Sequence, residues 1–186
     1  LIGAGPIDLV ELLSSPFPVQ MIAEMMDIPM ERRADFKRWS DNTVEALGGA
    51  VDLSVEERAR VEASILDFAM YFFGVVTERR PKAAEAEDLI SLLIRPSEDG
   101  ESLSDMEIVS FCVLLLVAGN ETTTNLIGNT TYHLLNHPEQ WKAFVADPSL
   151  DKSLIEESLR YDPPIQGFFR NTLSDTEVAG TRIPQG

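Results

Sequence analysis

The sequence predicts a mainly α-helical fold of the α-rich α+β class, with a long buried central helix and a small β-hairpin near the C-terminus. Apolar residues recur at helical spacing through most of the chain, and the stretch between Ser104 and Pro138 contains no proline. Short β candidates follow only after Pro164. With 186 residues, of which 44% are hydrophobic and 25% charged, the chain suits one globular domain.

Three helices are expected in the first eighty residues. Two of them, Pro18–Asp27 and Met30–Leu47, carry apolar residues at helical spacing, and a glycine pair ends the second. The third begins at a capping box formed by Ser54 and Glu57 and continues to about Arg80.

The longest predicted element lies in the middle of the chain. Before it, the polar segment Lys82–Asp88 predicts a loop and Asp88–Ile94 a short amphipathic helix. A second capping box, Ser104 with Glu107, then begins a helix of about 32 residues, roughly 48 Å long at 1.5 Å per residue. Its first half is apolar on all sides, which indicates a helix buried within a larger protein.

The last quarter of the chain changes from helix to strand. Two helices, Glu139–Ala146 and about Leu150–Tyr161, come first. The segments Ile165–Leu173 and Glu177–Ile183 are short β candidates, and Ala179-Gly180 divides the second into a hairpin.

Charge and composition exclude several classes of protein. Lys+Arg 15 against Asp+Glu 31 gives a formal net charge of -16, so the chain should repel nucleic acids and anionic membrane surfaces. The longest apolar run, Phe111–Gly119, is too short to span a bilayer. Cys112 is the single cysteine, which rules out an internal disulfide framework, fits a cytoplasmic location, and predicts a small core residue.

Polar residues interrupt the apolar central helix in a way that indicates a functional site. Gly119 costs about 1 kcal/mol relative to alanine in a helix interior. Glu121 is expected in an apolar neighbourhood, where burial raises the pKa of its carboxyl group. The hydroxyls of Thr122–Thr124 compete for the carbonyl four residues earlier. A carboxyl group beside a hydroxyl can deliver protons to a bound reactant. A helix kink with locally satisfied polar groups is the alternative that the helix alone leaves open.

The segment AGNETT, residues 118–123, resembles the oxygen-activation motif of the cytochrome P-450 family, whose central helix carries small-Gly-x-acid-Thr-Thr above the haem. The resemblance implies that Ala118 and Gly119 lie against the haem and leave room for oxygen. It also implies that Thr122 hydrogen-bonds the bound dioxygen and that Glu121 gates protons from solvent. On these terms Glu121 and Thr122 are the catalytic candidates.

A second motif lies downstream in the expected order. Glu157 and Arg160 are three residues apart on one helix face, a spacing that is commonplace on its own. Their position before Tyr161-Asp162-Pro163-Pro164 is similar to the E-x-x-R helix of the family, which implies a structural ion pair. Arg170 is either a strand arginine with its guanidinium in solvent or, by the resemblance, a ligand of a haem propionate.

The resemblance covers nearly the whole chain and is closest to the soluble bacterial branch. It implies that residues 1–186 are the central part of a single cytochrome P-450 domain, incomplete at both ends, without the haem-binding cysteine loop and inactive by itself. The cofactor implied is haem b, and no metal ligand is expected within this chain.

The implied activity of the parent protein is insertion of one oxygen atom of O2 into a small hydrophobic organic substrate. An electron-transfer partner, a ferredoxin or a flavin reductase, would supply the electrons. Positional guesses for the substrate pocket are these five residues: Leu114, Val117, Ala118, Ile165 and Phe168. The alternatives are a haem enzyme of the same fold that uses peroxide and a non-catalytic helical binding protein without haem.

The remaining histidine and aromatic residues predict no further site. His133 and His137 are four residues apart, but a third ligand is missing, so they are expected to interact with the C-terminal end of the helix dipole. Trp39, Trp141 and the phenylalanines are predicted to be core residues.

Overall fold

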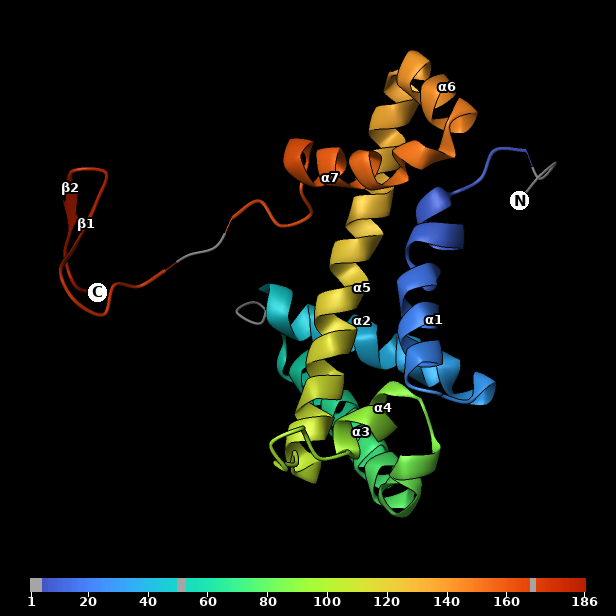
Figure 1. The fold of residues 1–186 in the computed structure, drawn as a ribbon, viewed down its shortest axis with the longest axis vertical. Helices are drawn as coiled ribbons and strands as arrows, with labels where there is room; N and C mark the ends of the chain where they lie inside the picture. The colour runs from blue at the N-terminus through green and yellow to red at the C-terminus, as the bar shows by residue number, and fades with distance from the viewer. Residues whose placement is uncertain (1–4, 50–52, 168–169) are drawn as a thin grey trace.

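The computed structural model describes residues 5–49, 53–167 and 170–186. Its first part is helical, and the elements in chain order are the π-helix η1 (Val10–Ser14), α1 (Pro16–Met25), the 3-10 helix η2 (Met30–Arg32), α2 (Arg33–Gly49) and α3 (Val55–Arg79). The next elements are the 3-10 helix η3 (Arg80–Glu85), α4 (Leu89–Ile94), α5 (Asp105–Asn136), α6 (Pro138–Ala146), the 3-10 helix η4 (Pro148–Leu150) and α7 (Asp151–Tyr161). Figure 1 shows α5 as the long axis of the helical part, with α1 beside it and α2, α3 and α4 around its N-terminal half.

The predicted capping boxes are confirmed at both long helices. The Glu57 backbone N–H donates to Ser54 Oγ (3.2 Å), and Glu57 Oε2 accepts from the Ser54 N–H (2.8 Å). The same pair of bonds joins Ser104 and Glu107 at the start of α5 (3.3 and 2.8 Å). These hydrogen bonds from serine lower the pKa of both glutamates. Because the bonds depend only on residues three positions apart, the sequence placed both helix starts correctly.

The core lies where α2, α3 and α5 meet. Phe36, Phe68 and Phe72 are fully buried, with the ring centroids of Phe68 and Phe72 4.7 Å apart. Trp39 is also buried, and its indole N–H donates to Asp67 Oδ2 (2.9 Å). This bond and one from Arg38 lower the pKa of Asp67. The centre of the core is therefore a group of aromatic rings, surrounded by aliphatic side chains, and the indole N–H of Trp39 has a hydrogen-bond partner.

Some of the predicted core residues lie outside the core. Trp141 is 40% exposed on α6, so its predicted burial is wrong. The same holds for Phe17, Phe73 and Phe111, which are 47%, 42% and 37% exposed. Residue type alone does not decide burial, because a large share of any protein surface is apolar.

Arg79 joins the end of α3 to two other parts of the bundle. Its guanidinium donates to the carbonyls of Met26 (2.7 Å) and Asp27 (2.8 Å) in the turn after α1. It also pairs with the carboxylate of Asp88, which caps α4 by accepting from the Ser91 N–H (3.1 Å). Burial acts to raise the pKa of Asp88, but the bonds from Ser91 and Arg79 outweigh it and lower that pKa.

Two segments differ from the sequence prediction. The segment Lys82–Asp88 is not simply a loop, because the 3-10 helix η3 continues to Glu85. Arg95 holds this short helix from 12 residues away, since its Nε donates to the Ala83 carbonyl (2.8 Å). The predicted strand Ile165–Leu173 is wrong for residues 165–167 and 170–173, none of which is in a strand. There Thr172 is tied to the end of the hairpin, its carbonyl accepting from the Gly186 N–H (3.0 Å).

The predicted hairpin is confirmed. Strands β1 (Thr176–Val178) and β2 (Thr181–Ile183) pair antiparallel, with Thr176 opposite Ile183. Ala179 and Gly180 both have positive φ, 49° and 78°, as a two-residue hairpin turn of the primed type requires. In Figure 1 the hairpin stands apart from the helices.

The central helix has the 32-residue length that was predicted. By length and composition α5 is the one helix among the described residues that could cross a membrane. The apolar run Phe111–Gly119 within it had been judged too short to span a bilayer. The central helix of a soluble protein passes the same test. Helix α5 packs against α1, α2, α3 and α4, and the amide of Asn120 on it is buried. Both features are typical of a core helix.

Candidate active site on the central helix

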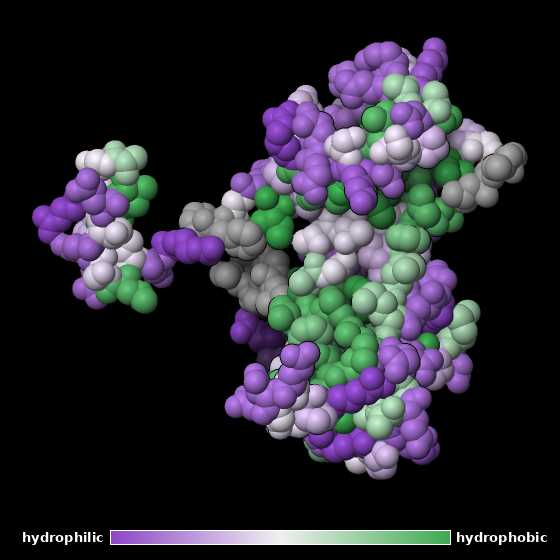
Figure 2. Space-filling model, in the orientation of Figure 1, coloured by the Kyte–Doolittle hydropathy of each residue, from purple (hydrophilic) through white to green (hydrophobic). Residues whose placement is uncertain are grey.

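Helix α5 has one buried face and one open face. Its buried face consists mainly of residues at spacings of three and four, namely Ile108, Val109, Cys112, Leu116 and Asn120. On the open face Leu114 is 62% exposed, and Ala118 and Glu121 are also exposed. Figure 2 shows hydrophobic surface gathered around the lower part of α5, its N-terminal half. Among the described residues the first half of α5 is therefore covered on one side only, and its burial within a larger protein stays a prediction.

Four of the predicted site residues share the open face, namely Leu114, Ala118, Glu121 and Thr122. Ala118 and Thr122 are one turn apart, and Glu121 is next to Thr122. The carboxyl group of Glu121 is exposed, so the apolar neighbourhood predicted for it is wrong. An exposed carboxylate beside a half-buried hydroxyl can still exchange protons with solvent and pass them toward the open face.

The hydroxyl of Thr122 makes the predicted bond within the helix. Its Oγ1 donates to the Ala118 carbonyl oxygen, four residues earlier, at 2.6 Å. This bond gives the hydroxyl a defined rotamer beside the small side chain of Ala118. The oxygen keeps lone pairs that can accept a proton, and rotation of the hydroxyl would release its own proton to another acceptor.

Gly119 faces α1 and not the open face. A Cβ built on Gly119 would lie 2.9 Å from Ile22 Cδ1. The close approach that this glycine allows is therefore that of an isoleucine side chain on α1. Contact between the backbone of Gly119 and a flat group stays a prediction.

Asn120 is a feature that the sequence analysis missed. Its side chain is buried (6% exposed) and its Nδ2 donates to Ser40 Oγ on α2. One turn later, Thr124 Oγ1 donates to the Ser14 carbonyl in η1 (3.0 Å) and lies 3.5 Å from Asn120 Oδ1. The signal was present, because Asn120 continues the buried series of Cys112 and Leu116 with an amide.

The ion pair predicted on α7 is confirmed. Arg160 Nε and Nη2 donate to the two carboxylate oxygens of Glu157 at 2.7 and 2.6 Å. This bidentate pair lowers the pKa of Glu157 and raises that of Arg160. Both side chains are exposed, at 59% and 67%, so the pair leaves them accessible to further partners.

His133, near the end of α5, contacts the residue that follows α7. His133 Nε2 lies 2.9 Å from Asp162 Oδ2, and Asn129 Nδ2 donates to the Asp162 carbonyl (3.2 Å). His137 Nδ1 lies 2.8 Å from the His133 carbonyl oxygen. Across residues 5–49, 53–167 and 170–186, no group of three His, Cys, Asp or Glu side chains could hold a metal ion. The junction with Asp162 was not predicted, because it joins residues 29 positions apart.

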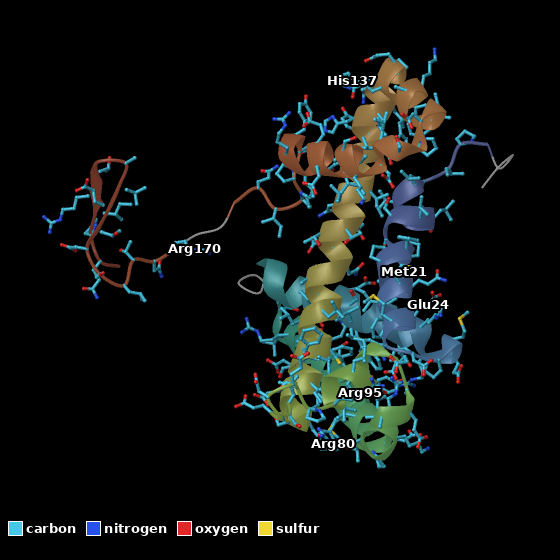
Figure 3. All side chains as sticks on the ribbon, in the orientation of Figure 1. Met21, Glu24, Arg80, Arg95, His137 and Arg170 are labelled. Carbon is cyan, nitrogen blue, oxygen red and sulfur yellow. The ribbon has the colours of Figure 1, made fainter. Side chains whose placement is uncertain are left out.

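The other predicted site residues are not brought together. Val117 is half-buried on α5, whereas Ile165 is 44% exposed in the segment after α7. Arg170 is exposed on the extended segment before the hairpin, away from α5 (Figure 3). Phe168 lies outside the described residues.

Comparisons with known proteins identify the family of this chain. The family model "Cytochrome P450" matches residues 55–146. The chain is 38% identical to the "Putative cytochrome P450 YjiB" of Bacillus subtilis over 99% of its length. The chain belongs to the cytochrome P450 family. It is also 39% identical, over 98% of its length, to a vitamin D(3) 25-hydroxylase of Pseudonocardia autotrophica. It spans 46% and 43% of these two curated relatives.

Solved structures of cytochromes P450 share the fold. The complex of CYP109E1 from Bacillus megaterium with corticosterone matches with a TM-score of 0.87 and 38% identity, covering 97% of this chain and 47% of that one. CYP109Q5 from Chondromyces apiculatus matches with a TM-score of 0.83 and 44% identity, covering 96% of this chain and 42% of that one. The predicted mainly α fold of the cytochrome P450 type is therefore confirmed.

The family implies a haem cofactor, and the open face of α5 fits one. The side chains there are apolar at Phe111 and Leu114 and small at Ala118, as the flat apolar face of a macrocycle requires. Cys112 is not suited to bind the iron, because it is fully buried on the opposite face and burial raises the pKa of its thiol to about 12. As predicted, it is a core residue.

Proposed function

We propose that this chain forms the oxygen-binding side of the active site of a haem-dependent monooxygenase. The parent protein would insert one oxygen atom of O2 into a small hydrophobic substrate, with electrons from a ferredoxin or a flavin reductase. The observation that carries the proposal is the placement of Ala118, Glu121 and Thr122 on the one open face of α5. Haem b, when bound, would supply the oxygen-activating redox chemistry.

Each residue of the open face has a separate task in this proposal. Ala118 keeps the space beside the helix clear, because its side chain is a single methyl group. Thr122 holds a proton at Oγ1 in its 2.6 Å bond to the Ala118 carbonyl, and rotation of the hydroxyl would donate that proton toward the space beside the helix. Glu121, exposed to solvent, supplies the next proton. Arg170, which lies on the extended segment away from α5, stays a candidate ligand for a haem propionate because its guanidinium suits a carboxylate.

The apolar end of the same face suggests the substrate class. Val117 lies one turn and Leu114 two turns before Glu121, so an apolar molecule would rest against them beside the proton donors. Relatives are named for vitamin D(3) and erythromycin hydroxylation, and CYP109E1 was solved with corticosterone. A largely apolar organic molecule is the substrate class that we propose.

The test replaces Thr122 in the full-length protein. Thr122→Ala should lower the product formed per reduced nicotinamide consumed, on the order of 10²-fold, and raise hydrogen peroxide correspondingly, because proton delivery contributes about 10²–10⁴-fold to such steps. Thr77→Ala is the matched control, since Thr77 Oγ1 donates to the Phe73 carbonyl (2.7 Å) in the same way on α3.

The control variant should keep the parent's ratio of product to peroxide. Unchanged coupling in Thr122→Ala, with substrate and haem bound as before, would show that the proton role is wrong.

A further inference from the structure

The buried face of α5 contains an amide where its pattern calls for an apolar side chain. Cys112, Leu116 and Asn120 follow each other at intervals of one turn, and all three are buried. An unpaired amide in such a place is destabilising, and asparagine is also a weak helix former. An apolar residue would stabilise the helix more simply, so the amide calls for another explanation.

The partners of this amide come from two other elements. Asn120 Nδ2 donates to Ser40 Oγ, which is fully buried on α2, 80 residues away in the chain. Thr124 Oγ1, on the next turn of α5, donates to the Ser14 carbonyl of η1 (3.0 Å). These bonds are directional, unlike the apolar contacts around them, and so they specify how α5 is turned about its own axis.

The network and the open face lie on opposite sides of the same helix turn. Asn120 precedes Thr122 by two residues, which is about 200° around a helix of 3.6 residues per turn. Gly119 adds a limit, because Ile22 packs against it from α1. A turn of α5 by about 20° would move an atom 4 Å from the axis by about 1.4 Å. Misplacement of that size can cost about 10²-fold in a positioned reaction.

We propose that Asn120, Ser40 and Thr124 are positioning residues that fix the rotational setting of α5. They act through that setting on Thr122, whose hydroxyl they direct toward the open face. The inference rests on the proposed function of Thr122 and extends it to residues that never touch the reacting groups. The network is retained for orientation, while its contribution to stability is small.

The test separates orientation from stability by removing both partners of the buried bond. In the full-length haem protein, Asn120→Leu with Ser40→Ala continues the apolar series and leaves no unpaired group, a change that is often neutral for stability. The unfolding temperature should stay within a few degrees, whereas the peroxide formed per reduced nicotinamide should rise several-fold. A crystal structure of this variant should show Thr122 displaced relative to α1–α3 by about 1 Å.

A second buried Asn–Ser pair provides the control. Asn42 Nδ2 donates to Ser64 Oγ (2.8 Å) between α2 and α3, and neither residue lies on α5. Asn42→Leu with Ser64→Ala should therefore leave coupling as in the parent. An equal rise in peroxide in this control would overturn the inference, because it would show general loosening of the bundle.

Two more outcomes decide the matter. If the Asn120 and Ser40 double variant folds, keeps Thr122 in place and stays coupled, the positioning role is refuted. If it does not fold, Thr124→Val takes its place, since it removes the bond to the Ser14 carbonyl and keeps the shape of the side chain; unchanged coupling there refutes the role equally. Thr122→Ala is assayed in parallel. If that variant also stays coupled, the proposed function has failed, and not the inference alone.

Discussion

Replacing Arg79 by methionine should destabilise the protein more than any other single loss of a charge among the described ion pairs. The guanidinium is 19% exposed and bonds two backbone carbonyls and the carboxylate of Asp88, which is 10% exposed. Methionine keeps much of the volume but leaves all three acceptors without this donor. An unmade buried hydrogen bond costs about 1–3 kcal/mol, and water can reach the Asp27 carbonyl, so we expect a loss of about 3 kcal/mol.

The assay is urea unfolding of the full-length protein, followed by circular dichroism at several pH values. The Asp88 pKa is lowered in the folded state, so its contribution to stability is present above the unfolded pKa of about 3.9 and is lost as pH falls through the folded value. Arg79→Met should weaken this dependence below about pH 4.

Lys37→Met is the matched control for charge loss. Lys37 and Asp41 form an exposed pair one turn apart (2.8 Å), and such pairs contribute about 0.3–0.5 kcal/mol. If Arg79→Met lowers the urea midpoint no more than this control does, the proposed joint between α3, α4 and the turn after α1 does not contribute to stability.

Two further predictions concern α5. The thiol of Cys112 should not react with a maleimide at pH 8 in the folded protein, because burial raises its pKa to about 12, and it should react on unfolding. Mass spectrometry of the peptide that contains Cys112 measures the labelling. Labelling at urea concentrations where the protein is still folded would contradict the burial of this thiol. Gly119→Ala should destabilise the protein by about 1 kcal/mol despite the better helix propensity of alanine, because the added Cβ would lie 2.9 Å from Ile22 Cδ1. Ile22→Val, which removes that atom, should restore most of the lost unfolding temperature when combined with it, and an additive further loss would contradict the contact.

The sequence identified residues of the open face of α5 but not which side of the helix is open. The motif AGNETT identified Ala118, Glu121 and Thr122 as candidates, and these residues lie together on that face. It also suggested that Glu121 lies in an apolar neighbourhood, whereas its side chain is exposed, and it gave no sign that Gly119 packs against Ile22 of α1. Which side of a helix is covered depends on the helices packed against it, and a run of apolar residues such as 111–117 does not specify that.

Features that depend on neighbours within about four residues were determined by the sequence alone. They include the capping boxes at Ser54 and Ser104, the bidentate pair of Glu157 with Arg160, and the hairpin turn at Ala179-Gly180. Their geometry follows from the regular spacing of one helix or one turn, so the residue types and their separation suffice.

Contacts between distant segments were decided only by the tertiary structure. The bond of Asn120 to Ser40 joins residues 80 positions apart, and that of Arg79 to the Met26 carbonyl joins residues 53 apart. His133 meets Asp162 in the same way, 29 positions away. No local spacing encodes such pairs, because they exist only once packing has chosen which helix lies opposite which and how each is turned about its axis.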